Sequence, residues 1–220
     1  MRIRSPKQQH PAPRGDIGDL VTRVPLPRPS PVFDPFLMLA HHGPQVYPPH
    51  NGGLPFGPHP HRGFETVTFV VDGEVAHRDS NGHEGVIGAG GVQWMTAGSG
   101  IVHAEQSPAS FREQGGPLEI LQLWVNLPAR LKATPPRYVG LARGDIPLVD
   151  LDHGRVRVQA VAGDWFCTRG PLDTLIDVRL GLIAFEGGGH LHIPVAADRT
   201  VLLYILRGDV VIAGAEALAQ

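Results

Sequence analysis

The stretch that decides the fold is FETVTFVV at Phe64–Val71, followed by DG at 72–73 and by EVAHRD at Glu74–Asp79. β-Branched and aromatic residues dominate the first segment and alternate with polar ones, a pattern typical of a half-buried β-strand. Asp-Gly between two such segments is a strong turn signal. The stretch therefore predicts a β-hairpin.

Further short strands are expected on both sides of this hairpin. They are predicted at Phe33–Ala40, His83–Ile87, Val92–Thr96, Ile101–Glu105 and Leu118–Asn126, with a loop over Gly43–Pro58. The chain holds 28 Gly and 22 Pro among its 220 residues, more turn punctuation than a helical bundle tolerates. Short, evenly spaced strands joined by turns predict an all-β sandwich or small barrel.

The sequence LPARLKAT at Leu127–Thr134 predicts a short helix that ends at two prolines and separates two domains. The first domain is predicted over residues 1–134, with an irregular N-terminal arm, and the second over residues 135–220. Strands are expected in the second domain at Val156–Val161, Ile176–Phe185 and Val201–Ile212, and RGD at 207–209 is a turn comparable to DG at 72–73. The second half thus repeats features of the first, but it is too short for a complete barrel.

Composition and charge exclude several classes of protein. Nineteen Lys and Arg against 21 Asp and Glu give a net charge of −2, whereas nucleic-acid-binding domains are normally basic. Cys167 is the only cysteine, which excludes an intrachain disulfide and a cysteine-based zinc site. No apolar run follows the basic start of the chain, and the run at Val201–Leu206 is too short to cross a bilayer. We expect a cytoplasmic protein that binds neither nucleic acid nor a membrane.

Histidines and carboxylates are concentrated at two places in the first half. His59 and His61 precede the first strand, and in an extended chain their side chains share one face with Glu65. His103 and Glu105 share one face of another predicted strand. Two strands of a small barrel can bring three imidazoles and a carboxylate to one point. This is the ligand set of non-haem Fe(II), with Mn, Ni, Cu or Zn as competitors.

A hydrogen-bonded core residue is the commoner role of any single buried histidine. An H-x-H motif followed about 40 residues later by H-x-E, both on predicted strands and both flanked by Gly turns, favours a metal site over that alternative. Strand alternation alone does not choose between Glu65 and Glu105 as the carboxylate ligand.

The other histidines and the tryptophans are expected to have structural roles. We predict solvent-facing positions for His41, His42 and His77, and core positions for Trp94 and Trp124. A second H-x-H motif, formed by His190 and His192, has no H-x-E motif behind it. No metal site is therefore predicted in the second half.

Several stretches carry a resemblance to a known family. They are HPHRGFETVT at 59–68, GEVAHRDS at 73–80, GVIG at 85–88 and VQWMTAGSGIVHAE at 92–105, followed by LQLWVNLP at 121–128 and PPRY at 135–138. A weaker match is DRTVLLYILRG at 198–208. On these residues the chain resembles the pirin family of the cupin superfamily over most of residues 15–215.

The resemblance implies a bicupin, that is, two stacked β-barrels of the double-stranded β-helix type, here with an incomplete second barrel. In this family only the N-terminal barrel holds metal, and iron is the metal usually associated with it. By motif position, the resemblance implies His59, His61, His103 and Glu105 as metal ligands, and it leaves Glu65 outside the ligand set.

The resemblance also implies two main alternative functions; an isomerase of small molecules or a storage role is a third, since cupins host many chemistries. Some pirins resemble quercetinases, dioxygenases that cleave flavonols such as quercetin, and in that case Glu105 is the catalytic residue that takes the proton of the flavonol 3-hydroxyl. The alternative is a non-enzymatic regulator whose iron senses the redox state and which binds transcription factors or metabolic enzymes. The expected partner is therefore a small aromatic substrate or a regulatory protein.

Overall fold

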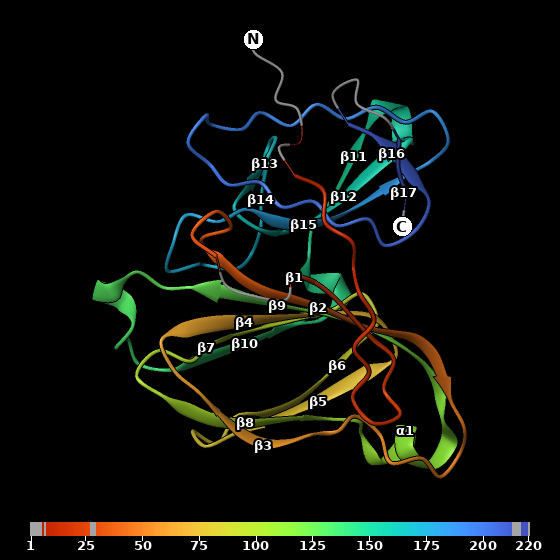
Figure 1. Cartoon of the computed structure of the whole chain (residues 1–220), viewed down its shortest axis with the longest axis vertical. Coiled ribbons are helices and arrows are strands. Elements are labelled where there is room, and N and C mark those ends of the chain that lie inside the picture. Colours follow the sequence, from red (N-terminus) through yellow and green to blue (C-terminus); the bar gives the residue numbers. More distant parts are fainter. Residues whose placement is uncertain (1–5, 7, 27–29, 213–216, 220) are drawn as a thin grey trace.

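The computed structural model describes residues 6, 8–26, 30–212 and 217–219. Its largest antiparallel sheet has the strand order β1 (Thr22–Leu26), β2 (Phe36–Tyr47), β9 (Gly116–Asn126), β4 (Phe64–Asp72), β7 (Val92–Thr96) and β10 (Arg137–Leu141). A second antiparallel sheet has the order β3 (Phe56–His61), β8 (Ile101–Gln106), β5 (Glu74–Asp79) and β6 (Glu84–Gly88). The two sheets face each other and enclose the N-terminal barrel (Figure 1). The predicted all-β fold is confirmed.

The hairpin predicted over residues 64–79 is wrong in its pairing, although both strands exist. β4 pairs with β7 and β9, whereas β5 pairs with β6 and β8 in the opposite sheet. The turn at residues 72–73 therefore carries the chain from one sheet to the other. Gly73 has φ +81°, and a Cβ there would lie 2.5 Å from the carbonyl oxygen of Pro117, so the close approach of this turn to β9 requires glycine.

The loop predicted over residues 43–58 is shorter than expected, because strands occupy both of its ends. β2 continues to residue 47, and β3 begins at residue 56. Pro44 lies at a register shift of β2, and β3, which contains Pro58 and Pro60, is an edge strand. Proline has no N–H to donate to a ladder, and bulges and edges are the places where a sheet tolerates it.

The described helices are short. α1 (Ala109–Gln114) precedes β9 and was not predicted, and 3₁₀ turns lie at Ala129–Leu131, Arg143–Asp145 and Asp152–Gly154. The first of these turns occupies the middle of the helix predicted over 127–134. Within the described residues, no helix has the length and apolar character that a membrane-spanning helix needs. β1 lies in the predicted N-terminal arm, of which residues 1–5, 7 and 27–29 lie outside the described residues.

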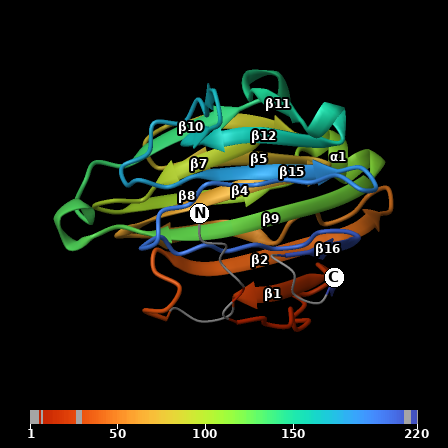
Figure 2. The same cartoon turned by 90° about the horizontal axis from the view of Figure 1, so that it is seen from above.

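The strands beyond residue 141 form smaller sheets on the outer side of the six-stranded sheet (Figure 1 and Figure 2). β11 (Leu148–Leu151), β12 (Val156–Ala162) and β15 (Leu180–Phe185) make an antiparallel sheet, β13 (Asp164–Trp165) pairs with β14 (Thr168–Arg169), and β16 (Asp209–Val211) pairs with β17 (Ala217–Ala219). The strand predicted over 156–161 is confirmed, and the one over 176–185 begins at residue 180. The strand predicted over 201–212 is wrong except at 209–211. Its residues Leu202, Tyr204 and Leu206 pack against the apolar core instead of joining a ladder.

This core lies between the outer face of the six-stranded sheet and the C-terminal strands. Val67, Trp94 and Leu123 from the sheet pack in one cluster with Val161 and Leu172 from the C-terminal part. The predicted domain boundary at residues 134/135 stays a prediction. Strand β10 lies just beyond it and pairs with β7 in the N-terminal sheet.

The interior of the barrel changes character from one end to the other. Val70, Val75 and Ile120 pack at the end nearest to the turn at 72–73. Farther along β4 and β9, the side chains on the same inner face are Thr68 and Gln122. The barrel thus has one apolar end, and its polar interior begins two residues farther along β4 and β9, at the next pair of inward-facing side chains.

Candidate metal centre

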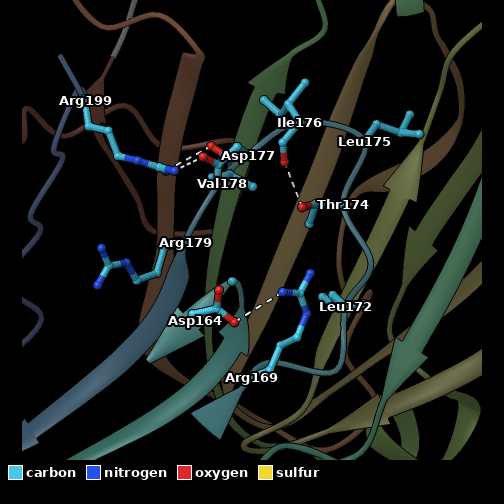
Figure 3. A pocket seen from close by; sticks show the side chains of 11 residues that line it. Asp164, Arg169, Leu172, Thr174, Leu175, Ile176, Asp177, Val178, Arg179 and Arg199 are labelled. Carbon is cyan, nitrogen blue, oxygen red and sulfur yellow. Dashed lines mark hydrogen bonds and ion pairs between the residues drawn. The ribbon is translucent and has the colours of Figure 1, made fainter. Parts of the chain in front are cut away.

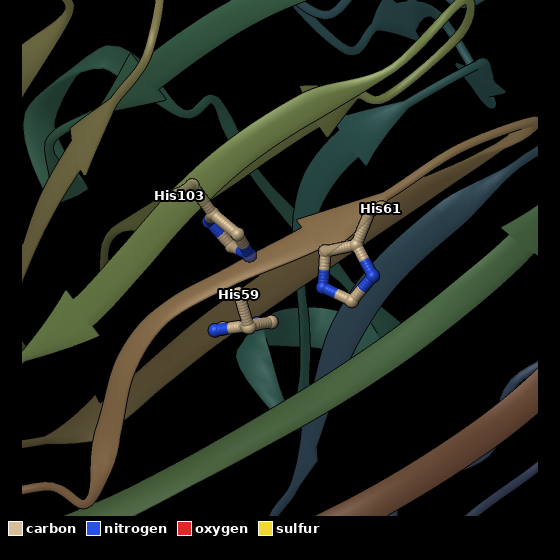
Figure 4. Close-up of side chains that lie close together, drawn as sticks. All are labelled: His59, His61 and His103. Atoms are coloured by element: carbon tan, nitrogen blue, oxygen red, sulfur yellow. The ribbon is translucent and has the colours of Figure 1, made fainter.

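Three histidines converge on the four-stranded sheet. His59 and His61 lie on β3, His103 lies on the neighbouring β8, and His59 stands directly opposite His103 in the ladder. The ring centroids are 4.5 Å apart for His59 and His103, 4.7 Å for His59 and His61, and 5.0 Å for His61 and His103. One ring nitrogen from each histidine lies within 4.8 Å of the other two. Figure 4 shows the three rings gathered around one point.

The hydrogen bonds of these rings leave nitrogen lone pairs free for a metal. The Nδ1–H of His59 donates to the carbonyl oxygen of Gly57 at 2.7 Å, which fixes the tautomer and leaves Nε2 as the free lone pair. Both ring nitrogens of His103 are buried and have no hydrogen-bond partner among the described residues. Buried polar atoms are normally satisfied, so this orphaned imidazole fits a metal ligand. The donor set suits Fe, Ni, Cu or Zn.

Burial and neighbouring charges also keep the imidazoles of His61 and His103 neutral. Burial, assisted by neighbouring His59, lowers the pKa of His61 to about 4. Burial, followed by the repulsion of His59 and His61, lowers the pKa of His103 to about 3. Only a neutral imidazole can donate its lone pair to a metal, so the rings of His61 and His103 are in the binding form throughout the physiological pH range.

Glu105 lies two residues after His103 on β8, and its carboxylate is anchored by donors from three strands. Thr68 Oγ1 donates to Oε1 at 2.7 Å, Gln122 Nε2 donates to Oε2 at 2.5 Å, and Gln93 Nε2 donates to Oε1. The carboxylate is not part of the cluster of converging histidine nitrogens. Its assignment as the fourth metal ligand therefore stays a prediction.

Glu65 lies on the other face of the six-stranded sheet. It stands opposite Thr96, whose hydroxyl donates to Oε1 of Glu65 at 2.7 Å, whereas the inward-facing Thr68 contacts Glu105. Burial raises the pKa of Glu65, opposed by the hydrogen bond from Thr96. The prediction that Glu65 shares one face of an extended chain with His59 and His61 is wrong. The chain bends at residues 62–63, and β3 and β4 belong to different sheets.

The structure adds groups that the sequence did not single out. His77 was predicted at the surface, but it is buried, and its ring centroid lies 5.3 Å from that of His103. Tyr138 of β10 stacks on His77 at 3.9 Å and donates through its hydroxyl to Oε1 of Gln93 at 3.2 Å. Burial and the Glu105 carboxylate raise the pKa of Tyr138 to about 12. The inward alternation of Val75, His77 and residue 79 along β5 was the signal that could have found this group.

His41 and His42 are also buried, contrary to the prediction that they face solvent, because β2 continues through both of them. They point to opposite faces of the sheet. His41 Nε2 lies 3.0 Å from Glu119 Oε1, on the side of the C-terminal part, and His42 Nδ1 lies 2.9 Å from the hydroxyl of Thr22. Burial, followed by the repulsion of His41, lowers the pKa of His42 to about 4.

Two cavities in the described part of the chain differ greatly in volume. A cavity of about 10 Å³, enough for roughly one water molecule, is lined by His42, Thr68, Glu105 and Gln122 together with apolar side chains. A second cavity of about 350 Å³ lies in the C-terminal part (Figure 3). Four of its five charged side chains form ion pairs within the chain, Arg169 with Asp164 and Arg199 with Asp177, and the fifth, Arg179, donates to the carbonyl oxygen of Pro194. The smaller cavity borders Glu105, but none of the three converging histidines lines it.

Comparison with known proteins gives this geometry a context. The Pirin family model matches residues 22–125, which include all three converging histidines. A pirin-like protein of Caulobacter vibrioides is 41% identical over 184 residues, which cover 83% of this chain and 64% of that protein. The chain spans less than two thirds of the length of this curated relative.

Two solved structures are similar in fold and sequence. The quercetin 2,3-dioxygenase from Acinetobacter baumannii has 38% sequence identity and a TM-score of 0.68, over 76% of this chain and 59% of that chain. The bacterial pirin YhhW from Escherichia coli, solved in complex with nickel(II), has 25% identity and a TM-score of 0.50, over 70% of each chain. The predicted cupin-type β-barrel fold is thus confirmed, and residues 22–125 of the chain form a Pirin-family domain.

Proposed function

We propose that this chain is a metal-dependent dioxygenase that acts on flavonols such as quercetin. The observation that carries the proposal is the cluster of three imidazoles whose nitrogens lie within 4.8 Å of one another. His59 and His61 are only partly buried, so the cluster has a side from which a substrate can approach. The similarity to the Acinetobacter baumannii quercetin 2,3-dioxygenase supports the choice of substrate class.

Iron is the metal that we propose, with His59, His61 and His103 as ligands and Glu105 as the fourth. When bound, the metal would act as a Lewis acid toward the substrate hydroxyl oxygen and as the redox partner of dioxygen. Imidazole ligands also accept Mn, Ni, Cu and Zn, and the nickel(II) complex of the Escherichia coli pirin supports this breadth. Metal identity is therefore a separate measurement from activity.

The residues of the chain have distinct tasks in the proposed reaction. Glu105 accepts the proton that leaves the 3-hydroxyl of the flavonol, and Oε2, which receives a single hydrogen bond, is the oxygen that takes it. Thr68, Gln93 and Gln122 hold the carboxylate in one orientation. The apolar end of the barrel, formed by side chains such as Val70 and Ile120, keeps bulk water away from the reacting groups.

Oxygen consumption tests the proposal directly. Protein loaded with one Fe(II) per chain is mixed with quercetin and O2, and oxygen uptake is compared with quercetin loss. We expect the two to match in the natural sequence, to fall below detection in His103→Ala, and to stay unchanged in His192→Ala, which alters an exposed histidine of the second half.

The opposite outcome also has a defined meaning. If protein shown to hold one iron per chain consumes no oxygen with quercetin, the dioxygenase proposal fails. Capture of a protein partner that differs between the ferrous and ferric forms would then favour the redox-sensing regulator.

A further inference from the structure

Two tryptophans of the N-terminal barrel lie on opposite faces of the six-stranded sheet. Trp94 stands opposite Val67 of β4, and Trp124 stands opposite Thr66, the next residue along that strand. Since successive side chains of a strand alternate, the two indoles point in opposite directions. Trp94 is 2% exposed in the core that faces the C-terminal part. Trp124, which was predicted to be a core residue, is only partly buried and lies on the inner face.

On this inner face Trp124 is a neighbour of the metal centre. Its ring centroid lies 5.2 Å from that of His61 and 4.7 Å from that of Phe64. The planes of the Trp124 and Phe64 rings are tilted by 34° relative to each other. Phe64 also contacts His61, at 5.1 Å between centroids, and it too is only partly buried. Phe64 and Trp124 thus form one aromatic surface, here called the aromatic wall, beside a histidine of the cluster.

The indole N–H of Trp124 donates no hydrogen bond within the described part of the chain. Its Nε1 is buried and has no hydrogen-bond acceptor there. Buried donors are nearly always satisfied, and tryptophan in particular places its N–H against an acceptor. Trp94 Nε1 lacks an acceptor among the described residues as well, but it lies in the core that faces the C-terminal part. The Trp124 indole differs because its ring centroid lies 5.2 Å from that of His61, a proposed metal ligand, and this position points to an acceptor supplied by a molecule outside the chain.

We propose that the aromatic wall binds the planar ring system of the substrate and that the Trp124 N–H donates a hydrogen bond to an acceptor on that ring system, such as a ring carbonyl. The inference rests on the proposed function for the position of the metal, and it specifies the substrate further: a planar aromatic molecule with an acceptor at its rim. Stacking supplies contact area, and the single N–H selects the orientation.

Anaerobic calorimetric titration separates the two contributions. Quercetin has a ring carbonyl, whereas catechin has a related ring skeleton without that carbonyl, and both are titrated into metal-loaded protein in the absence of O2. Trp124→Phe keeps an aromatic ring and removes the N–H, so we expect the Kd for quercetin to rise about tenfold and the Kd for catechin to stay the same. Trp124→Leu removes ring and N–H, so we expect both ligands to bind more weakly.

Two controls guard the interpretation. Trp94→Phe makes the same chemical change on the opposite face of the sheet and is expected to leave both Kd values and the metal content unchanged. Phe64→Leu keeps an apolar side chain and tests the aromatic wall independently if a Trp124 variant fails to fold. We expect this variant to bind both quercetin and catechin more weakly. Unchanged quercetin binding in a folded, metal-loaded Trp124→Phe would overturn the role of the N–H, because a bridging water would then be its partner. Unchanged binding in Phe64→Leu would overturn the role of the wall.

The failure of this inference and the failure of the proposed function are distinguishable. Binding is measured without O2, so an inactive protein whose quercetin Kd depends on Trp124 keeps the inference and loses the dioxygenase. Conversely, a protein that consumes oxygen with quercetin, and whose KM and kcat are the same in Trp124→Phe and Phe64→Leu, keeps the dioxygenase and loses the inference.

Discussion

The chain contains two H-x-H motifs in very different settings. His59 and His61 lie on β3, which pairs with β8 and thereby gains His103 as a third imidazole. His190 and His192 lie outside any strand, and both are exposed. The two motifs are identical as histidine patterns, but only the first has a neighbouring strand with a histidine at the matching register.

The difference shows that strand pairing, more than the motif itself, makes a metal site. Alternation puts the two histidines of an H-x-H motif on one face of a strand, and two imidazoles alone make a weak site. The third must arrive from another strand at the matching position, as His103 does opposite His59. Substitutions in the two motifs, and in the two halves that contain them, test this comparison.

The largest effect is expected on metal affinity. His103→Ala removes the imidazole that joins the two strands, and we expect the affinity for Fe(II) or Ni(II) to fall more than about 100-fold, beyond the effect typical of outer-shell changes. His190→Ala is the matched control and is expected to leave the affinity unchanged. Competition with a chromophoric chelator, together with the metal content after dialysis, measures both variants. Equal losses in the two variants would contradict the comparison.

The sequence could predict the first motif because strand alternation and spacing are local properties. It correctly placed β5 and β7 and the converging pair of His59 and His103. It missed what depends on pairing between distant segments. Which sheet β5 joins, and with it the buried position of His77, follows from the crossing of the chain at residues 72–73, and no local pattern encodes that crossing. The burial of His42 follows from the continuation of β2 through residues predicted to be loop, and the inner position of Trp124 follows from the pairing of β9 with β4.

A second effect, of comparable size, is expected on acid stability. The pKa of buried His42 is about 4 in the folded state, below the 6.5 of an ordinary histidine. As pH falls below 6.5, the unfolded chain binds a proton that the folded chain does not, so stability decreases until about pH 4 and then levels off. Above pH 6.5 both states are neutral, and the effect is absent. The gap of about 2.5 units between the pKa of His42 in the unfolded and the folded state corresponds to a loss of about 3 kcal/mol in the free energy of unfolding.

Urea unfolding of metal-free protein between pH 7 and 4 measures this loss. His42→Gln removes the titrating group and keeps a polar partner for Thr22, so we expect its stability to fall less steeply with acid than that of the natural sequence. His192→Gln changes an exposed histidine and should keep the original slope. Parallel pH profiles for all three proteins would show that burial of His42 does not contribute.

The smallest effect is expected on the free energy of unfolding when glycine is replaced in the two turns at residues 72–73 and 207–209. These turns were predicted to be comparable. Gly73 and Gly208 both have positive φ, +81° and +77°. An alanine Cβ at Gly73 would lie 2.5 Å from the carbonyl oxygen of Pro117, whereas a Cβ at Gly208 would meet nothing within 4 Å. Both substitutions therefore cost the backbone strain of a left-handed residue, about 1 kcal/mol, but only Gly73→Ala adds a clash with backbone that cannot move aside.

We expect Gly73→Ala to lower the free energy of unfolding by about 1–2 kcal/mol more than Gly208→Ala, measured from urea midpoints at neutral pH. The reason is architectural: the turn at Gly73 passes the chain between the two sheets against β9, whereas the turn at Gly208 is exposed. Equal losses would mean that the close approach to Pro117 relaxes without cost. In that case the crossing between sheets would not depend on glycine, and the two turns would be equivalent after all.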